Sequence, residues 1–111
     1  PKEEIITKFI KFYFEKNDYK NFKEVAINCF NSHYLKKSAE FYEIIIDFAY
    51  KNDDYLLVDE AFMDILDYKE TILSAKSYNI VLSANTRFFK DIVMKEIIEV
   101  EFFYYFLFRK L

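Results

Sequence analysis

The residues best suited to chemistry are the only cysteine and the only histidine of the chain, Cys29 and His33. Four positions apart on a helix, they would share one face, where a thiol and an imidazole can act as nucleophile and base. A working pair also needs an orienting group and an oxyanion site, and the sequence offers neither beside them. We therefore expect no catalytic residues and no enzyme activity. Cys29 is expected to be a buried structural residue, and His33 a solvated or capping one.

Metal and cofactor sites are also not expected. The histidine and the cysteine lack the additional ligands that zinc or di-iron sites use. Acidic residues gather at Asp59, Glu60, Asp64 and Asp67, but a calcium loop needs a glycine at its sharp turn and the chain contains no glycine. The same absence excludes glycine-rich phosphate loops. We interpret the four acidic residues as the solvated face of a helix.

The charge balance disfavours nucleic acid as a ligand. The formal net charge is −3, so a broad basic surface for phosphate is not expected. The first third of the chain is locally cationic, which leaves a basic strip open beside the alternative of an ordinary solvated helix face. The strip would comprise Lys8, Lys11, Lys16, Lys20, Lys23, Lys36 and Lys37.

Cysteine usage and hydropathy indicate an intracellular location. Cys29 has no partner for an intramolecular disulfide, which favours a reducing compartment, the cytoplasm or an organelle matrix. No stretch approaches the roughly 20 apolar residues of a membrane-spanning helix. The sequence starts at Pro1, without a methionine. We expect residues 1–111 to form a single helical domain that is a fragment of a longer chain.

The elements that must position these residues are helices, because a chain without glycine and with one proline lacks the usual residues of tight sheet turns. Short acceptor side chains precede several apolar runs and predict helix starts after Asp18 and Asp54, with Ser32 and Thr71 as further N-caps. A break is also expected near residues 85–87. The predicted helices span residues 2–16, 19–32, 35–51, 55–69, 72–85 and 90–109.

An apolar pattern recurs every 36 residues, the signature of stacked helical hairpins. The positions of Ile6, Phe9, Ile10 and Tyr13 return at Tyr42, Ile45, Ile46 and Ala49, and again at Tyr78, Val81, Leu82 and Asn85. The sequence therefore predicts an all-α fold of about six antiparallel helices in three stacked hairpins of ~36 residues, an α-solenoid segment. Ile10, Ile46, Phe62 and Ile65 are expected to be more than nine-tenths buried.

The last predicted helix is apolar nearly all round between Val100 and Phe108. A helix of this kind is buried on several sides, whereas a terminal repeat needs a polar outer face. Three coverings are open: further repeats of the same chain, a protein partner, or a membrane surface. The candidate interaction surface comprises Phe103, Tyr105, Phe106 and Phe108.

Residues 41–52, followed by Val58-Asp59-Glu60-Ala61-Phe62, resemble a pentatricopeptide repeat, and Ser77-Tyr78-Asn79-Ile80-Val81-Leu82 is similar to the start of a further unit. Tetratricopeptide repeats share the geometry, with small packing residues spaced as Ala49 and Ala61 are. The resemblance covers about two of the three hairpins and implies paired antiparallel helices. The glycine usual between the two helices and the closing proline are absent here.

The pentatricopeptide resemblance also implies RNA contacts, because two residues of each such repeat read one base. By position these are Glu43 with Ser74, and Asn79 with Lys110. Asn79 suits base reading, whereas Glu43 would repel phosphate.

The leading hypothesis is a noncatalytic helical-repeat scaffold that mediates protein–protein interaction within a larger assembly. Its partner would be another protein or further repeats of the same chain. The alternative is an organellar RNA-binding protein of the pentatricopeptide type. Two further hypotheses are a helical enzyme domain and a compact six-helix bundle.

Overall fold

The computed structural model describes residues 2–32, 34–67 and 71–109, and gives the backbone alone for residues 2, 3, 88, 89, 92, 93, 97, 98 and 100–109. Every regular element within these ranges is an α-helix, which confirms the all-α class. The helices are α1 (Lys2–Glu15), α2 (Tyr19–Phe30), α3 (Ala39–Lys51), α4 (Tyr55–Leu66) and α5 (Ala75–Arg109).

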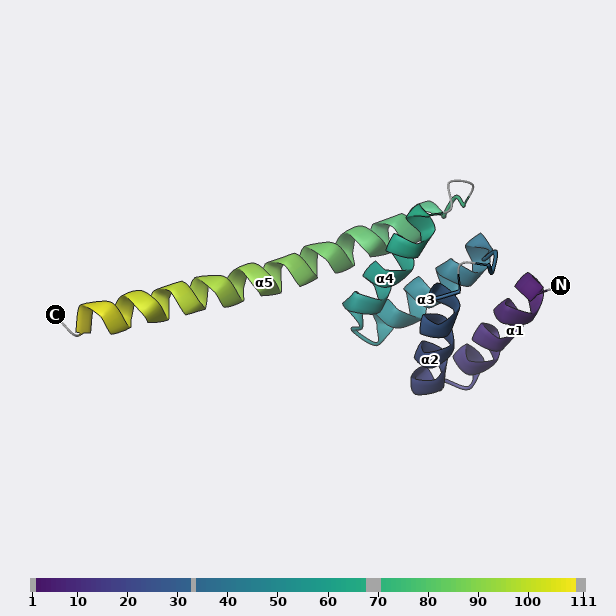
Figure 1. Ribbon diagram of the computed structural model, residues 1–111, viewed down its shortest axis with the longest axis horizontal. Coiled ribbons are helices and arrows are strands. Elements are labelled where there is room, and N and C mark those ends of the chain that lie inside the picture. Colours follow the sequence, from purple (N-terminus) through teal and green to yellow (C-terminus); the bar gives the residue numbers. More distant parts are fainter. Residues whose placement is uncertain (1, 33, 68–70, 110–111) are drawn as a thin grey trace.

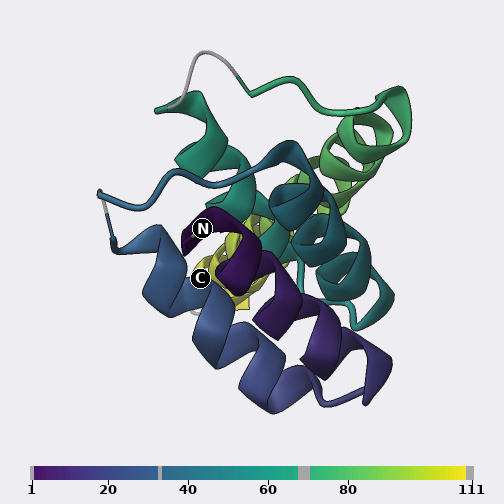
Figure 2. The same cartoon turned by 90° about the vertical axis from the view of Figure 1, so that its right-hand side faces the viewer.

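The helices pack chiefly against their neighbours in sequence. Helix α1 packs on α2, and α3 packs on α4, so each pair forms a hairpin. Helix α3 also lies between α1 and the first part of α5, while α2 contacts α4 (Figure 1). Seen from the amino-terminal end, α1 and α2 lie nearest the viewer (Figure 2). The first hairpin is thus one end of the packed body.

The two turns inside the hairpins have the same geometry, 36 residues apart. Asn17 and Asp53 adopt positive φ angles of 54° and 56°, the left-handed conformation in which many helices end. The next residues, Asp18 and Asp54, each accept a hydrogen bond from the amide three positions on and cap α2 and α4. The predicted helix starts at these two aspartates are confirmed.

The caps between the hairpins differ from the prediction. Ser38 caps α3 by accepting a bond from the Phe41 amide, and Ser74 caps α5 by accepting one from the Ser77 amide. These serines are also 36 residues apart. The predicted caps Ser32 and Thr71 are wrong, because both precede connecting segments that continue to residues 38 and 74.

The predicted break at residues 85–87 is also wrong. Helix α5 is continuous from Ala75 to Arg109, so the predicted helices 72–85 and 90–109 are one helix. The Thr86 hydroxyl donates to the Leu82 carbonyl one turn back, and Arg87 donates to the hydroxyl of Tyr55 at 2.6 Å. A threonine whose hydroxyl bonds the carbonyl four residues back can lie in the middle of a helix, so Thr86 does not end α5. The distal part of α5 extends away from the other helices (Figure 1).

The core lies between the two hairpins and the start of α5. Ile10, Ile46 and Ile65 are buried as predicted, whereas Phe62 is only partly buried at the edge of the core. The repeated stripe holds in α3 but not throughout. Phe9 in α1 is exposed, and in α5 only Val81 of the four predicted positions is buried. The buried residues are Ile10, Phe22, Ala26, Cys29, Phe41, Tyr42, Ile45, Ile46, Phe48, Ala49, Leu57, Val58, Ala61, Ile65, Leu73, Val81 and Ala84.

Candidate functional site

An apolar groove of about 380 Å³ runs along the outer face of α1 and is lined by Ile5, Lys8, Phe9, Phe12 and Tyr13. Ile5, Phe9 and Phe12 recur at i, i+4 and i+7, so they form one ridge on the helix. Each leaves about half of its surface exposed. We call Ile5, Phe9 and Phe12 the α1 face.

The sequence pattern did not single out the α1 face. The repeat predicts Phe9 in the core stripe, and Ile5 and Phe12 each lie one position away from that stripe. A usable signal was present in the period itself, because adding 36 to these positions gives Phe41, Ile45 and Phe48, all large and apolar. Periodicity identifies which residues are equivalent, but it does not identify which copy has a neighbour.

A second, more polar groove of about 530 Å³ lies between the carboxyl-terminal parts of α2 and α4. Ile27, Phe30 and Met63 supply apolar surface there, and the acidic residues come from α4 and its C-cap residue. Asp59 and Asp64 are only partly exposed, so the predicted solvated face holds for Glu60 and Asp67 alone. The acidic residues of the groove are Asp59, Glu60, Asp64 and Asp67.

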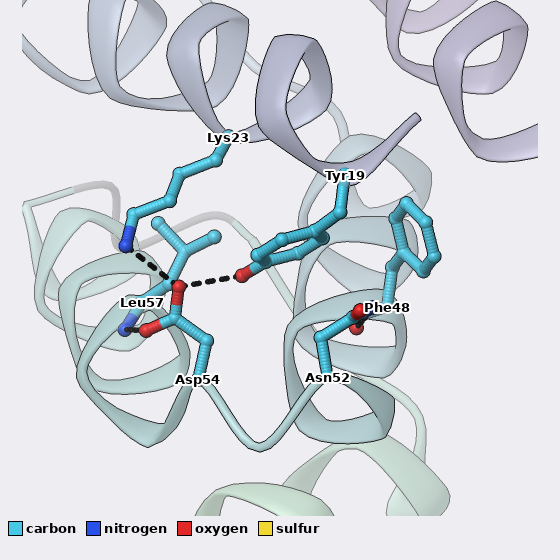
Figure 3. A network of polar contacts seen from close by, with 6 residues as sticks. All are labelled: Tyr19, Lys23, Phe48, Asn52, Asp54 and Leu57. Atoms are coloured by element: carbon cyan, nitrogen blue, oxygen red, sulfur yellow. Dashed lines mark hydrogen bonds and ion pairs between the residues drawn. The ribbon is translucent and has the colours of Figure 1, made fainter. Parts of the chain in front are cut away.

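Asp54 joins the two hairpins through a polar network (Figure 3). Its carboxylate accepts a 2.6 Å hydrogen bond from the Tyr19 hydroxyl and pairs with Lys23 at 2.8 Å, besides capping α4 through the Leu57 amide. Burial by itself would raise the pKa of Asp54, but the bonds from Lys23, Tyr19 and Leu57 hold that pKa below its ordinary value.

The pKa of the Tyr19 phenol is shifted in the opposite direction to that of Asp54. Burial, followed by the hydrogen bond to Asp54 and its negative charge, raises the pKa of Tyr19 far above the ordinary range. The phenol therefore stays protonated and donates its hydrogen bond, which makes it a cross-hairpin link and unsuited to act as a base.

A buried ion pair joins α4 to the segment before α3. Lys37 has a fully buried side chain, and its Nζ lies 3.0 Å from Asp64 Oδ2 and 3.4 Å from the Ser32 carbonyl oxygen. Tyr42 donates a 2.7 Å hydrogen bond to the same carboxylate oxygen. The sequence pattern predicts both charges in solvent, and this prediction is wrong. An ion pair between residues 27 positions apart leaves no local pattern in the sequence.

Cys29 is buried, as predicted. Burial raises the pKa of its thiol; the positive charge of Lys37 opposes this rise and the negative charge of Asp64 adds to it. The thiol is thus kept protonated, which disfavours nucleophilic attack. His33 lies outside the described residues.

The seven lysines of the possible basic strip lie in different environments, and three of them form ion pairs. Lys37 is buried in its ion pair, while Lys11 pairs with Glu40 on α3 and Lys23 with Asp54. The remaining members Lys8, Lys16, Lys20 and Lys36 are exposed. They come from α1, the turn after it, α2 and the connection before α3.

The candidate RNA contacts are in part brought together. Glu43 accepts a 2.7 Å hydrogen bond from the Ser74 amide, so the two residues meet where α3 lies beside the start of α5. They border a shallow groove of about 240 Å³ that also holds Glu40, Asp47 and Lys76. Asn79 is exposed on α5, and Lys110 lies outside the described residues.

The candidate interaction surface at the carboxyl end has a helical backbone in α5. The side chains of its four aromatic residues lie outside the described part of the structure. They are Phe103, Tyr105, Phe106 and Phe108.

No protein-family model, no curated protein sequence and no solved structure matches the chain. Among the described residues, no cluster of three or more histidine, cysteine, aspartate or glutamate side chains is arranged to hold a metal ion. The described helices also include none long and apolar enough to cross a membrane.

Proposed function

We propose that this protein is a noncatalytic helical-repeat scaffold, an α-solenoid segment that mediates protein–protein interaction within a larger assembly. Equivalent residues 36 positions apart support the repeat. Asp18 and Asp54 make the same cap, and so do Ser38 and Ser74. In addition, α3 packs between α1 and α5. Units that repeat their contacts in this way form extended surfaces suited to protein partners.

The observation that carries the proposal is the α1 face. Ile5, Phe9 and Phe12 are about half exposed on adjacent turns of one helix. Contiguous exposed apolar surface is a feature of protein interaction sites. Its neighbours Lys8 and Glu4 are exposed and charged, which supplies the polar rim of a typical protein interface.

The polar clusters support a noncatalytic role. Asp54 and Tyr19 are engaged in capping and in joining the hairpins, and Lys37 and Asp64 neutralise each other inside the fold. The proposal therefore assigns structural work to these groups. It also places the protein in a reducing intracellular compartment, where the single thiol of Cys29 would remain reduced.

RNA binding of the pentatricopeptide type is the weaker candidate. Glu43 and Ser74 are adjacent, but the Glu43 carboxylate is engaged by the Ser74 amide. Glu40 and Asp47 line the same groove and add negative charge that disfavours phosphate. The net charge of −3 acts in the same direction.

Site-specific photocrosslinking distinguishes the two candidates. A benzophenone amino acid replaces Phe9 in cells that produce the protein, and a matched variant carries it at Leu56 on α4, which is equally exposed. We expect protease-sensitive adducts at position 9 that are absent at position 56. Ribonuclease-sensitive adducts at position 9, with submicromolar RNA binding that weakens steeply with salt, would replace the proposal with RNA recognition.

A further inference from the structure

The α1 face has two equivalents in the same chain, and both are covered. Adding 36 to Ile5, Phe9 and Phe12 gives Phe41, Ile45 and Phe48 of α3, which are 0%, 0% and 4% exposed. Adding 36 again gives Ser77, Val81 and Ala84 of α5, at 5%, 2% and 1%. The three residues of α1 are 53%, 55% and 51% exposed. The chain thus builds one helix face three times and covers it twice.

The covering element at α3 is a helical hairpin. The Phe48 ring packs edge-on against Phe14 at the end of α1 and against Tyr19 and Phe22 of α2, with ring centroids 4.7–5.2 Å apart. At the other end of the same face, Phe41 meets Phe30 of α2. Both helices of the first hairpin thus contribute to the cover. Both helices of the second hairpin, α3 and α4, likewise contact α5, although α4 contributes more there than α2 does at α3.

Ion pairs mark the register of these contacts. Lys11 of α1 pairs with Glu40 of α3. The residues 36 positions later, Asp47 and Lys76, lie 3.9 Å apart with their charges exchanged. Glu4 occupies the position of Glu40 and Lys76 on α1, and it is exposed. A hairpin seated on α1 in the same register would place a basic residue opposite Glu4.

A second copy of this chain does not fit that description. The free face of α5, equivalent to the face of α1 that meets α3, carries Asn79, Asn85 and Thr86 beside Tyr78 and Leu82. Ser83 stands where Lys11 stands on α1, so no cation would face Glu4. This polar face has the character of a terminal repeat, whereas the α1 face does not.

We propose that the α1 face docks an amphipathic helical hairpin of a partner protein, which packs on α1 as the α1–α2 hairpin packs on α3. The hairpin presents aromatic or aliphatic residues to Ile5, Phe9 and Phe12, and a lysine or arginine to Glu4. This inference rests on the proposed protein-binding function and adds the kind of partner and its register.

An extended chain tests whether the α1 face accepts a hairpin. Residues 1–38 are followed directly by residues 3–111, so that a second α1–α2 unit precedes α1 in the 36-residue register and its Lys11 faces Glu4. We expect one unfolding transition at a higher temperature than that of the parent. Phe9→Lys in the second copy of α1, the copy that packs on α3, should lower the Tm of the extended chain by roughly 5 °C or more. The same substitution should leave the Tm of the parent nearly unchanged.

Leu56→Lys is the matched control, because Leu56 is as exposed as Phe9 and α4 does not contact α1 among the described residues. Leu56→Lys should change the Tm of the extended chain and the Tm of the parent by the same amount. A Phe9→Lys effect as small in the extended chain as in the parent would overturn the proposal. So would a concentration-dependent dimer of the parent protein that Phe9→Lys abolishes, since a second copy would then cover the face.

Mapping the adducts of the Phe9 photocrosslinker supplies a readout that does not require the extended chain to fold. The crosslinked partner peptides should come from two consecutive helices with a basic residue near the attachment point. Peptides from an extended or disordered segment would refute the hairpin while leaving protein binding intact. Ribonuclease-sensitive adducts would instead refute the proposed function itself.

Discussion

The Glu43 carboxylate accepts a 2.7 Å hydrogen bond from the backbone N–H of Ser74, the residue that caps α5. The pair 36 residues earlier is Thr7 and Ser38, whose hydroxyl oxygens lie 3.5 Å apart, and Ser38 caps α3. Each cap is thus linked to the helix of the preceding hairpin by a side chain at the same repeat position. The link is kept although the residue type changes from threonine to glutamate.

The aspartate caps should contribute measurably to stability. Asp18→Ala and Asp54→Ala each remove the acceptor for a first-turn amide, which costs about 0.5–2 kcal/mol of unfolding free energy. Asp54→Ala should be the more severe, because it also removes the partner of Tyr19 and Lys23. Urea unfolding at pH 7 measures both values. Equal losses for the two variants would show that the cross-hairpin bonds add nothing.

The Tyr19–Asp54 bond should limit stability at both ends of the pH scale. The pKa of Asp54 is lowered in the folded state, so its contribution is present above its unfolded pKa and is lost as the pH falls below about 4. The pKa of Tyr19 is raised, so its contribution is complete below about pH 10 and declines above it. Unfolding free energies across pH should show Asp54→Asn flattening the acid limb and Tyr19→Phe the alkaline limb. Unchanged limbs in these variants would assign the pH dependence to other groups.

The buried pair of Lys37 and Asp64 should be costly to break from one side. Lys37→Met leaves the Asp64 carboxylate without its cation, and losing one partner of a buried pair typically costs about 3–5 kcal/mol. Lys36→Met removes a neighbouring exposed lysine and should stay within about 0.5 kcal/mol of the parent. Chemical denaturation of the two variants gives the comparison. Similar losses at both positions would mean that the pair is not formed in solution.

The left-handed turn at Asn17 should reverse the usual ranking of glycine and alanine. At φ = 54° a Cβ is disfavoured, so Asn17→Gly should be more stable than Asn17→Ala by about 1–2 kcal/mol. At Asn31, where φ is −75°, alanine should equal or exceed glycine. Thermal unfolding of the four variants tests the ranking. The same order at both sites would contradict the turn geometry.

The core should respond to truncation as a packed interior. Ile46→Ala removes buried methyl groups and should cost about 2–5 kcal/mol, whereas Ile5→Ala removes the same groups from a half-exposed position and should cost far less. Denaturant midpoints measure the difference. Comparable losses would mean that Ile5 is already covered in solution, for example by self-association.

Local signals predicted the parts of the fold that local chemistry determines. The helix starts at Asp18 and Asp54 are predicted correctly, because a short acceptor side chain just before an apolar periodic run is typical of an N-cap. The caps of α3 and α5 were misplaced, since Ser32 and Thr71 offer the same acceptor groups as Ser38 and Ser74. Tertiary contacts that local patterns do not reveal lie at both connections: Lys37 is buried in its ion pair with Asp64 before α3, and the Ser74 amide donates to Glu43 before α5.

The α1 face and the course of α5 were missed for the same reason. The 36-residue period predicts Phe9 in the core, because periodicity shows which positions are equivalent but not which of them are covered. The stretch at Asn85 resembled a turn because it is polar, yet without glycine or proline nothing in it prevents a helix. Arg87 holds it against Tyr55, a contact across 32 residues that composition does not reveal.

Helix α1 contacts α2 and α3, but among the described residues it contacts neither α4 nor α5. Each hairpin therefore meets partners that were synthesised shortly before it. A chain connected in this way can condense progressively as it leaves the ribosome, because no late segment has to close a long loop onto an early one. Contacts of this kind allow the helices to assemble in the order in which they are synthesised, with α3 packing onto an α1–α2 hairpin that has already formed.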